Sequence, residues 1–384
     1  MPSQPVPESA LPESALPESA LPESALPEPA LISVVVPVYG IGDYLPACLD
    51  SLLAHPAEPG PAGPAIEVIA VDDASPDGSG RLLDARAGLD PRLSVLHLAS
   101  NAGPGHARNI GLARATGRYV WFVDGDDMLP AGALAAVAAR LLRDRPDVLL
   151  IDYEECYPGG RTRPNPGSSL LCAAPGGTFS LADSPQLINL TMTSWSKLFR
   201  RDFLLGLDEP FRPGIHEDIP VTCAALLAGR ISALDRVCYS YRRSRPGSFM
   251  TTTTSEHWGV FGAYEEVLDM LRKLTESADP VATAAVQSAL FERAIWHYST
   301  VLEAGRHGIG RAGGSGLVPR AERERFFNRM HADFLRYRPS GYRIPAGARG
   351  VKFRLIERGS YQTYELLEPV NRLRVAAGRR LRRH

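Results

Sequence analysis

Acidic side chains cluster directly after two short apolar runs of the sequence. Residues 67–71 (Glu-Val-Ile-Ala-Val) precede the pair Asp72-Asp73, and residues 118–123 (Arg-Tyr-Val-Trp-Phe-Val) precede 124–127 (Asp-Gly-Asp-Asp). Short runs rich in Val, Ile and aromatic residues are typical of buried strands. Clustered carboxylates repel one another, and a cation among them keeps them ionised. The sequence therefore predicts a divalent metal, Mn²⁺ or Mg²⁺, that holds a phosphate-bearing ligand.

The segment 124–127 is the more specific of the two clusters. An Asp-x-Asp at a strand end lets a turn bring Asp124 and Asp126 onto one metal, which leaves sites for diphosphate oxygens and water. Asp127 is a third candidate ligand. A metal here would neutralise charge that develops on a departing nucleoside diphosphate. The alternative is a solvated turn whose acids cap a helix at 131–144.

The other pair of acids, Asp72 and Asp73, is followed by the turn sequence 74–79 (Ala-Ser-Pro-Asp-Gly-Ser). A carboxylate at this strand end could accept a hydrogen bond from a base N–H or a ribose hydroxyl. The alternative is that Asp73 or Asp77 caps the next helix. We expect one acid to cap this helix and another to hold the ligand.

A glycine-rich turn occupies residues 101–109 (Asn-Ala-Gly-Pro-Gly-His-Ala-Arg-Asn). Pro104 suits the first turn of a helix, and helix N-termini favour phosphate oxygens. Arg108 is placed to reach a diphosphate. The glycine spacing differs from that of a P-loop, and no G-x-G-x-x-G follows the first apolar run, which disfavours a dinucleotide-binding oxidoreductase.

Three further segments carry candidate residues. His216, Glu217 and Asp218 could supply a general base, although two acids at a helix start also complement the helix dipole. Aromatic and cationic side chains at 193–200 and 239–248 could stack on sugars and pair with phosphate. The alternatives for these side chains are core packing and a solvated face. The candidate acceptor-binding residues are His216, Trp195, Lys197, Arg242 and Arg245.

Alternating elements must position these residues. The pattern predicts a mostly parallel α/β sheet with right-handed crossovers, and ligands of such sheets lie beyond the carboxyl ends of the strands. Residues 157–178 are expected to form a surface loop, and 256–304 two long helices. The expected strands are 32–38, 67–71, 93–98, 118–123 and 148–151, and the expected helices are 43–53, 78–88, 104–115, 131–144 and 321–338.

The composition describes an ordinary soluble protein of 384 residues, with 44% apolar and 22% charged residues. A net charge of −1 gives no global field that would recruit nucleic acid. The five cysteines are scattered without a C-x-x-C pair, which argues against structural zinc and disulfides and favours a reducing cytoplasm. The sequence shows no secretory signal and no apolar stretch long enough to span a membrane.

Both ends of the chain have biased sequences. Residues 1–30 repeat the unit Pro-Glu-Ser-Ala-Leu and are expected to form a disordered acidic tail. Residues 370–384 hold six arginines and no acid, so they could lie on an anionic membrane surface or form a solvated end. The expected location is therefore the cytoplasm, with peripheral contact at the inner face of the plasma membrane.

In combination, five motifs in this order resemble family 2 glycosyltransferases of the GT-A fold. They lie at 34–39, 71–79, 105–109, 122–127 and 217–218, and the resemblance spans residues 31 to 250. The segments around 195–200 and 241–248 look like those of actinobacterial enzymes of cell-wall or surface-polymer synthesis. The implied organisation is a tail at 1–30, a GT-A domain at 31–250 with a nucleotide-sugar half (31–152) and an acceptor half (153–250), a helical extension at 251–340 and a basic tail at 341–384.

The resemblance also implies roles. Asp72 and Asp73 would hold the nucleoside, and Pro37, Val38 and Tyr39 would line the base. Asp124 and Asp126 would touch ribose and metal, with Asp127 in support. Asp218 would deprotonate an acceptor hydroxyl for a single inverting displacement, and Glu217 and His216 would orient the acceptor or the base.

A Q-x-x-R-W segment is absent from the sequence, which favours transfer of single sugars to a saccharide or lipid-linked polymer acceptor. Two alternatives remain at this point. One is a non-catalytic module that binds a nucleotide-sugar or polymer, and the other is a nucleotidyltransferase on a similar sheet.

Overall fold

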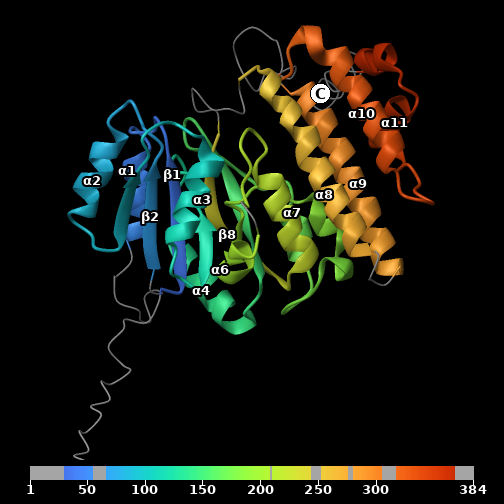
Figure 1. Ribbon diagram of the computed structural model, residues 1–384. Helices are drawn as coiled ribbons and strands as arrows, with labels where there is room; N and C mark the ends of the chain where they lie inside the picture. The colour runs from blue at the N-terminus through green and yellow to red at the C-terminus, as the bar shows by residue number, and fades with distance from the viewer. Residues whose placement is uncertain are drawn as a thin grey trace, which may run out of the picture.

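The computed structural model describes residues 30–54, 66–207, 210–243, 252–275, 280–304 and 317–367 (Figure 1). The expected tails at 1–29 and 370–384, and Arg245, lie outside the described residues. A central sheet has the strand order β3-β2-β1-β4-β7-β5-β6, and β8 also pairs with β5. The strands are β1 (Ile32–Val38), β2 (Ile66–Asp72), β3 (Leu93–His97), β4 (Tyr119–Phe122), β5 (Val148–Tyr157), β6 (Arg161–Pro164), β7 (Lys197–Arg200) and β8 (Ile231–Arg242).

Helices cover both faces of this sheet, as predicted. Successive side chains along each strand point to opposite faces of the sheet. In β1, Val35 therefore lies in one buried cluster, and Val34 and Val36 lie in the other. The helices of the sheet region are α1 (Leu45–Leu53), α2 (Ser79–Ala87), α3 (Pro104–Arg114), α4 (Ala133–Asp144), α5 (Ser168–Cys172), α6 (Arg201–Leu205) and α7 (Asp218–Ala228).

Parallel pairing brings the carboxyl ends of four strands to one edge of the sheet. Val38 at the end of β1 is in register with Asp72 of β2, and Asp72 is in register with His97 of β3. On the other side of β1, Phe122 of β4 is in register with Val35. The two acid clusters therefore lie at the same edge, at the ends of the two strands that flank β1, as the sequence predicts.

A helical region follows β8. It contains α8 (Gly259–Thr275), α9 (Pro280–Glu303), α10 (Arg323–Tyr337) and α11 (Gly347–Glu357). α8 packs beside α7 and α9, which joins the helical region to the sheet region (Figure 1). Its core is aromatic: the Phe261 ring lies 4.5 Å from the ring of Tyr298 and 4.5 Å from that of Phe326. No helix in the described parts of the chain is both long and apolar enough to cross a membrane.

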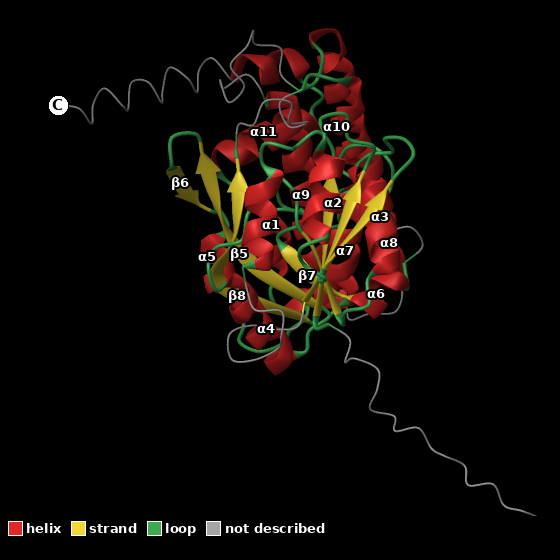
Figure 2. Cartoon of the chain, turned by 90° about the vertical axis from the view of Figure 1, so that its left-hand side faces the viewer, coloured by secondary structure: helices red, strands yellow, loops and turns green. Residues whose placement is uncertain are grey.

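Three expectations about the elements are wrong. The expected loop at 157–178 contains β6, at the edge of the sheet, and α5 (Figure 2). The strand expected at 148–151 continues to Tyr157 as β5. Its second half is more polar and only partly buried, so apolar periodicity misses it, and it is held in the sheet by β6 and β8. A further helix, α11, lies in the segment that was expected to be a basic tail.

Candidate active site

Arg108 joins segments that are far apart in the sequence. Its guanidinium, on α3, is 5% exposed and forms two charge-assisted hydrogen bonds. Nη2 donates to Oδ1 of Asp124 at 2.8 Å, and Nη1 donates to Oε1 of Glu217 at 2.5 Å. Burial lowers the pKa of Arg108, but the carboxylates of Asp124, Glu217 and Asp218 outweigh burial and raise it. The guanidinium is therefore a fixed cation between the Asp-x-Asp turn and the acidic pair of α7.

The turn 124–127 is fastened to β8. Asp127 is 1% exposed, and its carboxylate accepts hydrogen bonds from the Arg242 backbone N–H at 2.6 Å and from the Tyr239 hydroxyl at 2.7 Å. Burial raises the pKa of Asp127, and the nearby Asp126 and Asp124 raise it further. Both oxygens of Asp127 thus have protein partners, which suits a residue that shapes the turn.

Asp124 and Asp126 are only partly buried. Gly125 separates them, and a Cβ at this position would lie 2.5 Å from Cδ1 of Ile41, so a larger residue would require the Ile41 side chain to move. Within the described residues, no group of three or more His, Cys, Asp or Glu side chains is arranged to hold a metal ion. Two hard carboxylates at the sheet edge nevertheless suit Mg²⁺ or Mn²⁺ if a bound phosphate and water complete the coordination.

Asp73 anchors the start of α3. It is 2% exposed, and its two oxygens accept hydrogen bonds from the backbone N–H groups of Ala102 and Gly103, both at 2.8 Å. Arg108 lies one turn beyond this anchor. The two predicted acid clusters are therefore linked through α3 and its arginine, although they follow different strands.

Asp72 has different partners. Its carboxylate accepts a hydrogen bond from the Ser75 N–H at 3.0 Å and lies 2.9 Å from Nδ1 of His97. Burial raises the pKa of Asp72, but hydrogen bonds from Ser75 and His97 outweigh burial and lower it. The acid at the start of α2 is Asp77, whose Oδ1 accepts a hydrogen bond from the Ser79 N–H at 3.1 Å.

Among the residues predicted to line a base, Val38 is buried and Pro37 partly buried, whereas the Tyr39 ring is 47% exposed at the carboxyl edge. That exposed ring is a surface on which a planar base could stack. It follows directly on β1, next to the Asp72 end of β2.

Asp218 begins α7 immediately after Glu217. Burial raises the pKa of Asp218 to about 7, and Glu217 adds to the rise, whereas Arg108 and Lys197 oppose it. Within the described residues, the Asp218 carboxylate accepts no hydrogen bond, so its oxygens are available to a ligand. A carboxylate with a pKa near neutrality is suited to general-base catalysis.

His216 precedes this pair in a left-handed backbone conformation with φ of +72°. Its ring lies 5.6 Å from that of His257 and 5.4 Å from that of His297, measured between centroids. Burial lowers the pKa of His216 to about 3, and His257 lowers it further, so the ring is neutral at physiological pH. His216 therefore packs where the sheet region meets the helical region.

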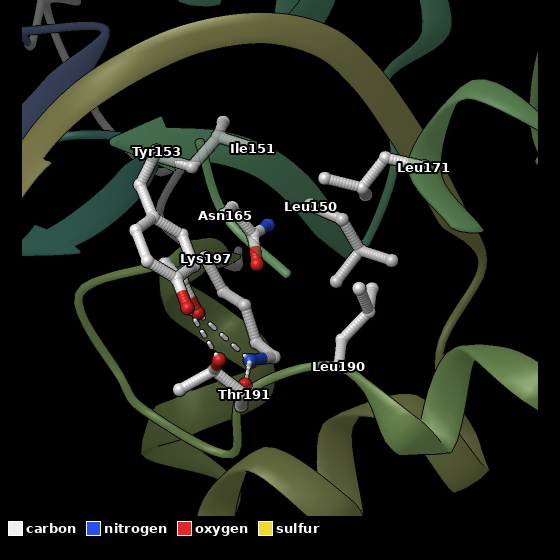
Figure 3. A pocket seen from close by; sticks show the side chains of 9 residues that line it. Leu150, Ile151, Tyr153, Asn165, Leu171, Leu190, Thr191 and Lys197 are labelled. Atoms are coloured by element: carbon white, nitrogen blue, oxygen red, sulfur yellow. Dashed lines mark hydrogen bonds between the residues drawn. The ribbon is translucent and has the colours of Figure 1, made fainter. Parts of the chain in front are cut away.

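The predicted acceptor residues occupy different environments. The Trp195 ring is 4% exposed and stacks on Tyr239 with centroids 4.6 Å apart, which is the core-packing alternative. Lys197 is also buried (Figure 3). Arg242 lies beside the acidic turn: its Nε donates to the Asp126 carbonyl at 2.7 Å, and its guanidinium lies 5.0 Å from the Tyr44 ring centroid.

Two residues with clear positioning roles were not predicted from the sequence. Tyr239 accepts a hydrogen bond from the Asp124 N–H at 3.1 Å and donates to Asp127. Asn109 joins α3 to the segment before α7, because its side chain donates to the Phe211 carbonyl at 2.8 Å and accepts from the Phe211 N–H at 3.2 Å. Asn109 follows Arg108 in a segment that was already singled out. Tyr239 begins the segment 239–248, which was singled out for aromatic side chains that could stack on sugars and not for contacts with the acidic turn.

Comparisons with known proteins agree with this arrangement. The chain is 30% identical to the glycosyltransferase EpsJ of Bacillus subtilis over 221 residues, which cover 56% of this chain and 61% of EpsJ. It is 33% identical over 224 residues to the poly(ribitol-phosphate) beta-N-acetylglucosaminyltransferase TarS of Staphylococcus aureus, covering 57% of this chain and 37% of TarS. The chain thus spans less than two thirds of the length of these relatives.

Among solved structures, the chain resembles residues 1–349 of S. aureus TarS in complex with UDP-GlcNAc. The TM-score is 0.66 at 23% identity, and the match covers 89% of this chain and 91% of that one. A likeness of this extent shows that the fold is the one predicted. The model of the family described as Glycosyl transferase family 2 matches residues 33–206, and this segment of the chain belongs to that family.

Proposed function

We propose that the protein transfers a sugar from a nucleoside-diphosphate donor to a hydroxyl group of an acceptor, with inversion at the anomeric carbon. The observation that carries the proposal is that Arg108 joins Asp124 to Glu217, next to the Asp218 carboxylate. The site combines a phosphate-binding cation with a base that has no hydrogen-bonding partner among the described residues. Membership of family 2 favours sugar transfer over nucleotidyl transfer.

In this reaction Asp218 accepts the proton of the acceptor hydroxyl. The acceptor oxygen forms a bond to the anomeric carbon while the bond from that carbon to the diphosphate oxygen breaks. The bonding electron pair leaves with the diphosphate, so one displacement inverts the configuration. Glu217 holds Arg108, whose charge favours the departing phosphate. Tyr39 and the Asp72–Asp73 end of β2 would receive the nucleoside.

The donor set of the Asp-x-Asp turn fits a divalent metal bound together with the donor. Asp124 and Asp126 would hold it, and Asp127 would support the turn through β8. When bound, Mn²⁺ or Mg²⁺ neutralises negative charge on the leaving diphosphate. The acids of the turn therefore belong to donor binding, whereas those at the start of α7 belong to acceptor activation.

The acceptor is proposed to be a saccharide or lipid-linked polymer of the cell wall or cell surface. The similarity to TarS, a poly(ribitol-phosphate) beta-N-acetylglucosaminyltransferase, supports a polymer of this kind. An anionic membrane surface on the cytoplasmic side is the location that the arginine-rich segment 370–384 favours. The proposed division of labour places donor binding in residues 31–152 and acceptor binding in 153–250.

Metal and donor binding can be tested together by thermal unfolding. Addition of a nucleotide-sugar, with UDP-GlcNAc as the first probe, is expected to raise the midpoint further when Mn²⁺ or Mg²⁺ is present, because a ligand stabilises the state that binds it. Asp126→Asn should abolish the metal-dependent part of the shift. Asp202→Asn, at a carboxylate that is 78% exposed on α6, is the matched control. A metal-dependent shift that survives in Asp126→Asn would remove this residue from the metal site.

The pH dependence of transfer should report the base. Because burial raises the pKa of Asp218 to about 7, the carboxyl group is protonated and inactive below that pH. We expect kcat/KM to rise about tenfold per pH unit below pH 7 and to level off above it. The measurement is an initial-rate profile from pH 5.5 to 9 at fixed ionic strength. A flat profile across this range would argue against Asp218 as the base.

A further inference from the structure

Lys197 is a buried cation that the proposed mechanism does not yet use. It lies at the start of β7 and is 1% exposed. Its Nζ donates to the Thr191 carbonyl at 2.7 Å (Figure 3). It also donates to the Thr193 carbonyl and to Oγ of Ser196, both at 3.1 Å. All three acceptors are neutral. Burial of an ammonium group among neutral groups costs free energy of folding. A nearby negative charge would offset that cost.

The segment that holds this amine packs against the helix of the proposed base. Met192 lies between Thr191 and Thr193, two of the residues that bind Nζ. Its Sδ lies 3.8 Å from Sγ of Cys223 on α7. Asp218 lies five positions before Cys223, at the first position of the same helix. The loop that binds Nζ therefore packs against the helix that begins with Asp218.

The charged and titratable groups that face the amine come from two helices. Asp218 and Cys223 face it from α7, and Arg293 faces it from α9. Burial lowers the pKa of Lys197 to about 7, and Asp218 is the strongest of the groups that oppose this change. In return, Lys197 and Arg108 are the two cations that counter the effect of burial on Asp218.

We propose that Lys197 is a positioning residue of the transfer reaction: its buried ammonium is the counter-charge that keeps the Asp218 carboxylate ionised until it accepts the acceptor proton. This inference rests on the proposed role of Asp218 as the base. The other groups that face Asp218 are Glu217 on the same turn, Arg108 on α3 and Asp124 after β4. Arg108 is shared with Asp124 and Glu217, whereas Lys197 forms no hydrogen bond to a carboxylate of the residues that the structure describes.

The first test is the pH profile of Lys197→Gln, in which an amide can still donate to the Thr191 carbonyl without a charge. Loss of the cation should raise the pKa of Asp218 by about one unit, so the acidic limb of kcat/KM moves up by the same amount. The expected result is a loss of about tenfold at pH 6 and of less than about threefold at pH 9. An equal loss at every pH would assign Lys197 a merely structural role and overturn the proposal.

Lys197→Arg keeps the charge, and its pH profile of kcat/KM provides a second test if the glutamine variant folds poorly. A small cavity lies beside the amine and is lined by Asn165, Thr191 and Leu190 (Figure 3). A guanidinium stays protonated throughout the range, so the acidic limb should stay in place or move to lower pH. A limb that moves up in Lys197→Arg overturns the proposal. Lys352→Gln, which removes a lysine bound to Glu303 in the helical region, is the control and should leave the profile unchanged.

A second measurement does not depend on activity. The ¹³C carboxyl resonance of Asp218, assigned by its absence in Asp218→Asn, can be titrated by NMR in the wild type and in Lys197→Gln. The midpoint should move up by about one pH unit in the variant. An unchanged midpoint in an active enzyme overturns the role of Lys197 alone. A shifted midpoint in a protein that transfers no sugar overturns the proposed function instead.

Discussion

Asp218→Asn should bind the donor normally and lose transfer by about a thousandfold or more, because an amide cannot accept the acceptor proton. The expected pattern is an unchanged thermal shift with nucleotide-sugar and metal, together with a fall in kcat. The donor contacts are assigned to other residues, Asp124, Asp126 and Tyr39. The measurement is product formation under saturating donor, followed for long enough to detect a thousandfold loss.

The stability of this variant separates catalysis from folding. The pKa of Asp218 is raised to about 7 in the folded protein, above its usual value of 3.8. The folded state therefore binds this proton more tightly than the unfolded state does, and the stability that the group contributes is lost as pH rises from about 4 through 7. Above pH 7, Asp218→Asn should be at least as stable as the wild type in urea unfolding. Full transfer activity in this variant would remove Asp218 from the mechanism.

Arg108→Met should damage both stability and activity. The substitution leaves the carboxylates of Asp124 and Glu217 without their shared partner in a largely buried setting, where their side chains are 27% and 11% exposed. Removal of one member of a buried ion pair typically costs about 3–5 kcal/mol in the free energy of unfolding. We expect a loss of this order and a fall in kcat/KM of at least about a hundredfold, since donor phosphate loses its cation.

Three further variants show whether the losses of stability and activity in Arg108→Met come from the missing charge, the missing planar group or the unpaired carboxylates. Arg108→Lys keeps the charge without the planar fork and should fall between the wild type and Arg108→Met. Arg108→Met combined with Glu217→Gln should recover part of the stability without recovering activity, because one of the stranded charges is removed. Arg338→Met breaks a more exposed ion pair with Glu357 and should cost less than about 1 kcal/mol. Normal transfer by Arg108→Met would mean that Arg108 is structural only.

The acids at the sheet edge could be predicted because the signals that identify them lie close together in the sequence. Apolar runs that end in acids at 72–73 and 124–127 identify two strands, and parallel pairing places their carboxyl ends together. The helix starts at 79, 104 and 218 were marked by turn residues, glycines and acids. For these elements, local propensity and the final fold agree.

The partners of each carboxylate could not be predicted in the same way. Glu217 lies 109 positions after the arginine that it binds, and no periodicity encodes such a distance. Asp73 and Asp127 look alike in the sequence, yet backbone amides before α3 engage one and β8 engages the other. Trp195 could equally have stacked on a sugar, and only the position of Tyr239 decides in favour of the core.

The anchor between Asp73 and the start of α3 makes the length of one segment critical. Asp73 fixes Gly103, and Arg108 follows five residues later in a continuous helix. A single inserted residue between them would turn the guanidinium by about 100° around the helix axis and shift it by about 1.5 Å. Such a change would aim the cation away from both carboxylates without altering a single chemical group, so this interval should tolerate substitution far better than any change in its number of residues.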